Sequence, residues 1–147
     1  MCSMLRAVTL PGLMLALSAG PSVAAESSAA SLYARMGGEA AVTAITAELI
    51  DRTVADPKLK RSFDKVGLVR LKKMLAEHIC SLTGGPCQYS GDSMIDVHAG
   101  QEIREDEFYG MVEILREVMR KHGVGLRERN ELLALLAPMK RDVVTRQ

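Results

Sequence analysis

The chain has 147 residues, enough for one domain but short for two, and its 19 basic and 18 acidic side chains almost balance. This balance argues against nucleic acid or an anionic membrane surface as the main partner. Aromatic side chains are scarce, with three tyrosines, two phenylalanines and no tryptophan. The centre of the fold is therefore filled either by aliphatic side chains or by a flat aromatic cofactor.

The first 25 residues have the features of a secretory signal peptide. Arg6 is the only charge among them, an apolar stretch covers Val8 to Leu17, and small residues lead up to Ala25. This stretch is too short and too poorly flanked for a membrane span. We expect cleavage after Ala25, export to the periplasm, a flexible arm over residues 26–30 and one domain over residues 31–147. The expected product has no membrane span and is a monomer or weak dimer.

The cysteines change in number if this cleavage takes place. Cys2 is lost, and Cys80 and Cys87 remain as an even pair. Disulfides persist in oxidising exported compartments, so these two residues can form one. Two free buried cysteines are the alternative. Two thiols alone cannot complete a zinc site.

Three helices are expected before residue 83. Ser31 can cap a one-turn helix that ends at Gly37 and Gly38. Longer helices follow over Glu39 to Ala55 and over about Leu68 to Leu82, each with apolar side chains at helical spacing. These apolar positions are Val42, Ile45, Leu49 and Ile50 on the first of the two, and Leu68, Leu71, Leu75, Ile79 and Leu82 on the second.

The stretch from Cys80 to Ile103 is the most informative part of the chain. Its glycine–proline sequence ends the preceding helix, and a short helical piece from Asp92 to Val97 then leads to His98 and stops at Gly100. A single imidazole at the end of a short helix is suited to bind a group that is held in a fixed position. Neutral imidazole is a common metal ligand, and globins hold haem iron through one histidine. The alternative is a surface histidine at a helix end.

Two further helices complete the expected fold. One begins with three acidic residues at 105–107, where the helix dipole favours them, and ends near Lys121. The last covers roughly Leu126 to Thr145, with a kink at Pro138. Every long segment is helical, so the sequence predicts an all-α fold.

Several short motifs, in this order and spacing, resemble the truncated haemoglobins, most closely their first group, over about Ser31 to Thr145. The matching pieces are Ser31-Leu32-Tyr33 with Gly37-Gly38, Ala55-Asp56-Pro57 with Leu59 and Phe63, Leu71, Thr83-Gly84-Gly85-Pro86, Tyr89-Ser90-Gly91, Met94, His98-Ala99-Gly100, Ile103, Phe108 and Ala137-Pro138. The resemblance implies a globin-like two-over-two helical sandwich around haem b. It makes His98 the proximal iron ligand and Phe63 an aromatic contact of the porphyrin. The cofactor-binding residues expected from it are Ile50, Phe63, Leu71, Leu75, His78, Met94 and His98.

The distal side departs from the pattern of many relatives. Ile50 stands where they place a tyrosine that donates a hydrogen bond to O₂, and Leu75 stands where they often place a glutamine. Leu71 offers no donor either. Nitric oxide dioxygenase or peroxidase-like activity is therefore not supported by these residues, whereas haem binding is.

Three classes of function remain open from the sequence. The first is reversible binding of O₂, CO or NO at haem iron held by one histidine, with an unknown reductase as a partner. The second is exported electron transfer or redox sensing, with Met74 or His78 as a sixth iron ligand or with a Cys80–Cys87 redox pair. The third is a cofactor-free helical domain in which His98 is structural.

Overall fold

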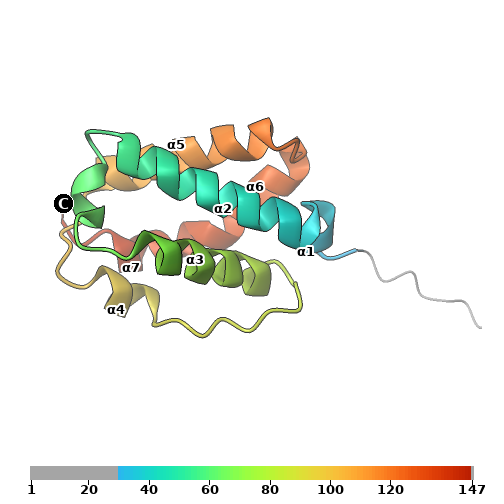
Figure 1. Ribbon diagram of the computed structural model, residues 1–147, viewed down its shortest axis with the longest axis horizontal. Coiled ribbons are helices and arrows are strands. Elements are labelled where there is room, and N and C mark those ends of the chain that lie inside the picture. The colour runs from blue at the N-terminus through green and yellow to red at the C-terminus, as the bar shows by residue number, and fades with distance from the viewer. Residues whose placement is uncertain (1–29, 147) are drawn as a thin grey trace, which may run out of the picture.

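The computed structural model describes residues 30–146, so the expected signal peptide and nearly all of the expected arm lie outside it (Figure 1). Within this range the chain is helical without strands, and its one isolated β-bridge pairs Arg104 with Arg146. The helices are α1 (Leu32–Arg35), α2 (Gly38–Ala55), α3 (Leu68–Leu82), α4 (Met94–His98), α5 (Glu105–Lys121), α6 (Leu126–Leu136) and α7 (Lys140–Val143), with 3₁₀ turns η1 (Lys60–Phe63) and η2 (Ala137–Met139). This confirms the all-α prediction.

The long helices form the body of the fold. Helix α2 packs on both α3 and α5, and α5 packs on α6, while α4 lies against α7 (Figure 1). None of the helices in residues 30–146 combines the length and the apolar composition that a membrane span requires.

The hydrophobic core lies on the α2 side of the sandwich. All four apolar positions predicted for α2 are buried. The first three pack with side chains of α1, α3, α5 and α6, whereas Ile50 lines a cavity. The stripe on α3 behaves differently, because only Ile79 among its five members is fully buried. Leu71 and Leu75 are half-buried because they line a cavity.

The helix ends follow local chemistry. The Ser31 side chain accepts a hydrogen bond from the amide of Ala34 at 3.2 Å, as the N-cap prediction requires. Helix α4 begins at Met94 and includes His98, so the predicted bounds of Asp92 to Val97 were wrong by two residues at the start and one at the end. The reason is Ser93, whose hydroxyl caps α4 by accepting from the amide of Asp96.

The predicted last helix is divided into three pieces. Helix α6 ends at Leu136, the turn η2 contains Pro138, and α7 ends at Val143. Proline has no amide hydrogen to donate and its ring crowds the preceding turn, so the α-helical ladder is broken there rather than only kinked. Beyond α7 the amides of Thr145 and Arg146 both donate to the carbonyl oxygen of Ile103.

Cys80 and Cys87 are joined by a disulfide between the end of α3 and the loop that leads to α4. Their sulfur atoms are 1.99 Å apart and their Cα atoms 5.8 Å apart. The chain between them turns tightly, since the amide of Gly85 donates to the Cys80 carbonyl at 2.8 Å. A Cβ atom on Gly85 would lie 2.5 Å from the Cys80 sulfur, so only glycine fits beneath the bond.

We expect the protein purified under oxidising conditions to have no titratable thiol at Cys80 or Cys87. The bond closes a loop shorter than 15 residues, so the loop-entropy model limits its stabilisation to less than about 3 kcal/mol. Thiol counting in the denatured, unreduced protein tests this, with a reduced sample as the positive control. Two reactive thiols before reduction would contradict it.

Candidate functional site

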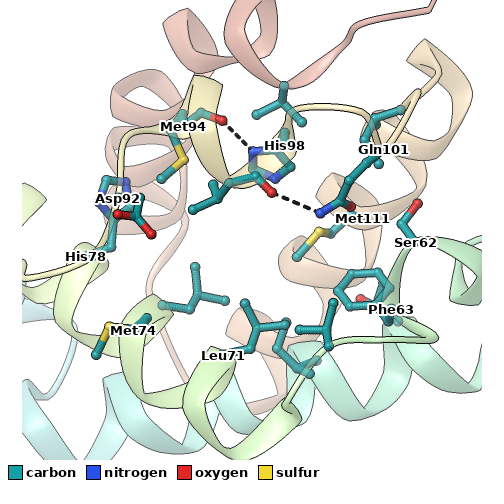
Figure 2. Close-up of a pocket in the computed structure, with 18 of the residues that line it drawn as sticks. Ser62, Phe63, Leu71, Met74, His78, Asp92, Met94, His98, Gln101 and Met111 are labelled. Carbon is teal, nitrogen blue, oxygen red and sulfur yellow. Dashed lines mark hydrogen bonds between the residues drawn. The ribbon is translucent and has the colours of Figure 1, made fainter.

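A cavity of about 380 Å³ lies between α3 and α4, with further walls from α2, η1 and α5 (Figure 2). This size is within the range of small-molecule and cofactor pockets. Its lining is mostly apolar. The structure brings all seven predicted site residues to this one cavity, namely Ile50, Phe63, Leu71, Leu75, His78, Met94 and His98.

His98 is the last residue of α4 and is half-buried at the wall of the cavity. Its Nδ1 lies 2.8 Å from the carbonyl oxygen of Met94. A carbonyl can only accept, so Nδ1 carries a proton, and in the neutral form of the ring Nε2 keeps its lone pair. Metal-ligating histidines are commonly oriented in this way, by a hydrogen bond from the other ring nitrogen. Figure 2 shows the ring across the cavity from Leu71 and Met74 of α3.

Three apolar side chains opposite His98 offer no hydrogen-bond donor. Ile50, Leu71 and Leu75 contribute only hydrocarbon, and Ile50 is only 1% exposed. Thr53 also lines the cavity, but its hydroxyl donates to the Leu49 carbonyl at 2.7 Å. A ligand on this side would therefore meet an apolar surface.

His78 lies at the edge of the cavity, which Asp92 also lines (Figure 2). Its ring packs edge-on against Tyr89, with the ring centroids 4.8 Å apart. Its Nε2 is buried and has no hydrogen-bond partner in the described part of the chain. Burial lowers the pKa of His78, which favours the neutral imidazole.

Met74 also lines the cavity, one turn from His78 on the same helix. In Figure 2 its thioether is turned away from His98. The two sequence-based candidates for a sixth ligand therefore differ, because the Nε2 of His78 is buried without a partner in residues 30–146, whereas the thioether of Met74 is turned away from His98 (Figure 2).

An ion pair stands at the end of the cavity near η1. The Glu107 carboxylate is 5% exposed and accepts hydrogen bonds from Arg61 and from the Arg104 amide. Burial alone would raise the pKa of Glu107, but these hydrogen bonds and the charge of Arg61 outweigh it, and the pKa lies below its ordinary value. Glu107 is therefore ionised at neutral pH.

Several lining residues were not among the predicted site residues. Phe108 and Met111 of α5 and Tyr89 before α4 add aromatic and thioether surface, and Arg70 of α3 lies at the exposed rim. The periodicity of α5 predicts an apolar face, but not whether that face meets core or cavity. The sequence predicts Glu107 only as one of three acids favoured by the helix dipole. Its partner Arg61 is 46 residues earlier, a separation that gives no sequence signal.

Comparisons with known proteins give the family. The bacterial-like globin family matches residues 31–145 of this chain. The group 1 truncated hemoglobin GlbN of Mycolicibacterium paratuberculosis is 30% identical over 116 residues, which cover 79% of this chain and 85% of that protein. The group 1 truncated hemoglobin of Tetrahymena pyriformis is 25% identical over 113 residues, covering 77% and 93%.

Solved structures agree on the fold. The Fe(III) form of the Tetrahymena pyriformis truncated hemoglobin matches with a TM-score of 0.75 at 24% identity, over 78% of this chain and 98% of that one. The 2/2 hemoglobin of a Synechococcus species, in the cyanomet state with covalently attached heme, matches with a TM-score of 0.73 at 23% identity, over 80% and 100%. The chain belongs to the bacterial-like globins and, among them, to the group 1 truncated haemoglobins, whose cofactor is haem with iron.

Proposed function

We propose that the protein holds haem b through His98 and reversibly binds a diatomic gas, O₂, CO or NO, at the iron. The observation that carries this proposal is the His98 imidazole at the cavity wall, whose Nδ1 is held by the Met94 carbonyl, so that Nε2 is the nitrogen left to bind a metal. Bound haem supplies an iron with an open coordination position for the gas.

The residues around the cavity fit this cofactor. In residues 30–146 no group of three His, Cys, Asp or Glu side chains could hold a metal ion, so a metal at His98 needs donors that the cofactor brings itself. The apolar side chains Phe63, Leu71 and Met94 suit a flat hydrophobic ring. The exposed guanidinium of Arg70 at the rim suits the carboxylates of haem.

The opposite wall decides which gas chemistry the protein favours. Ile50, Leu71 and Leu75 exclude water and offer no proton, so they cannot stabilise the partial charge of bound O₂ or guide a proton to it. We therefore propose gas binding rather than nitric oxide dioxygenase or peroxidase activity.

Absorption spectra of the ferric, ferrous and CO-bound protein test the proposal. We expect a Soret band in stoichiometric amount and a ferrous spectrum typical of five-coordinate iron that shifts on addition of CO. A purified, folded protein that takes up no haem on reconstitution would contradict the proposal and favour the cofactor-free alternative.

A second candidate is electron transfer or redox sensing with His78 as the sixth ligand. The buried, unpartnered Nε2 of His78 favours it. The thioether of Met74 gives it less support, because it is turned away from His98 (Figure 2). A six-coordinate ferrous spectrum without added ligand, lost in His78→Ala, would support this candidate against the first.

We also propose that the protein is exported to the periplasm after cleavage behind Ala25. The supporting features are the apolar N-terminal stretch and the small residues that precede this site. Mass spectrometry of the protein from a periplasmic extract should give a chain that begins at Glu26. A chain that keeps its first 25 residues and stays in the cytoplasmic fraction would contradict this.

A further inference from the structure

Helix α4, which carries His98, is weakly anchored by its own packing. It has five residues, packs mainly on α7, and leaves Ile95 and Val97 exposed. The position of the His98 imidazole therefore depends on how the chain is held on either side of α4. Before α4 the chain is tied to α3 by the disulfide. After α4 it enters the connection over residues 99–104.

Arg61 of η1 holds this second connection. Its guanidinium donates to the carbonyl oxygen of Gln101 at 3.1 Å and to that of Glu102 at 2.7 Å. Glu102 has a φ of +50°, the one positive φ among the non-glycine residues that the structure describes. This conformation is unfavourable for a residue with a Cβ atom, so it has to be imposed by contacts from outside.

Glu107 fixes Arg61 in turn. Its two carboxylate oxygens accept hydrogen bonds from Nε and from one terminal nitrogen of the guanidinium. The Oε2 of Glu107 also accepts a hydrogen bond from the Arg104 amide at 2.9 Å. The planar fork of arginine allows it to meet the carboxylate and two carbonyl oxygens at once, which lysine cannot do. Glu107 and Gln101 themselves line the cavity.

We propose that Arg61 and Glu107 are a positioning pair that holds the turn after His98 and thereby sets how tightly this histidine retains haem. The pair acts through the Gln101 and Glu102 carbonyls, three and four residues beyond the ligand, and neither side chain is itself a ligand. This inference rests on the proposed binding of haem at His98.

The test compares Arg61→Ala with a matched variant, Arg52→Ala. Arg52 pairs with Glu117 between α2 and α5, does not line the cavity, and has a side chain 39% exposed against 41% for Arg61. Haem loss is measured as transfer to excess apomyoglobin. We expect Arg61→Ala to lose haem at least about tenfold faster, the change that one charge-assisted hydrogen bond corresponds to. Arg52→Ala should change the rate less than about twofold, as a surface ion pair does.

Two more readouts separate positioning from general destabilisation. The iron–histidine stretching band of the ferrous protein, seen by resonance Raman, should shift or broaden in Arg61→Ala and not in Arg52→Ala. Arg61→Lys should keep the defect in part, since one ammonium cannot replace the fork. Equal haem loss in the two alanine variants, or an unchanged Raman band in Arg61→Ala, would overturn the proposal.

Amide hydrogen exchange distinguishes its failure from that of haem binding. In the haem-free protein, the amides of residues 98–104 should exchange faster in Arg61→Ala than in the wild type, and those of α2 should not. Unchanged exchange there would overturn the positioning role. A wild type without a Soret band would instead overturn the proposed function. The exchange data would still show whether Arg61 and Glu107 hold the turn after His98.

Discussion

Replacing His98 by alanine is expected to abolish stoichiometric haem binding. His98 lies at the cavity wall with its Nδ1 held by the Met94 carbonyl, and the other two histidines are placed differently. His78 lies at the cavity edge, and His122 bonds through Nε2 to Glu48 at 2.9 Å outside the cavity. Removing the side chain leaves the apolar walls to hold the cofactor alone. The Soret absorbance per mole of protein after reconstitution measures the loss.

The matched control is His122→Ala, which removes an imidazole from the end of α5 without touching the cavity. It should keep the wild-type haem content and spectrum. The assignment of His98 would be wrong if His98→Ala kept its haem while His78→Ala or His122→Ala lost it.

Replacing Ile50 by tyrosine is expected to slow O₂ dissociation. The wild-type wall has no donor, so we expect fast O₂ release and a preference for CO, whose bound form carries little charge. A phenol at this buried position provides one hydrogen bond, worth about 0.5–1.5 kcal/mol, or roughly a two- to tenfold slower release. Stopped-flow measurement of O₂ and CO dissociation from the same samples is the test.

Ile50→Phe is the matched control, since it adds the same ring without the hydroxyl. It should leave the O₂ rate near that of the wild type, apart from steric effects that also change the CO rate. His78→Ala tests whether this histidine reaches the bound gas, and little change in the O₂ rate is expected because His78 lies at the edge of the cavity (Figure 2). Slow O₂ release in the wild type that disappears in His78→Ala would mean that His78 is the donor.

The sequence predicted those parts of the fold that depend on local pattern. The bounds of α3 at Leu68 and Leu82 were correct, because an apolar stripe begins after one glycine and ends before two others. The buried face of α2 follows from helical spacing in the same way. The last helix was predicted too long because the strength of the break at Pro138 depends on what holds the chain beyond it, here the Ile103 carbonyl.

The sequence predicts those residues of the candidate site that belong to a recognisable motif. It does not predict contacts between residues that are far apart in the chain. All seven site residues line one cavity, since the family pattern places them in order along the chain. The pairing of Arg61 with Glu107 has no such pattern, and the sequence predicts Glu107 only as one of three acids that the helix dipole favours in the first turn of α5. A charged side chain at the start of a helix can be exposed to water or paired with another side chain, and only the tertiary structure shows which of the two occurs.

The separation between the hydrophobic core and the cavity affects the order in which the chain folds and binds its cofactor. Within residues 30–146 the hydrophobic core is built from α1, α2, α3, α5, α6 and the turn before α6, and α4 contributes no member to it. The chain can therefore complete its core before any cofactor arrives, and moving α4 aside leaves that core intact. This architecture permits folding of the core first and binding of haem afterwards.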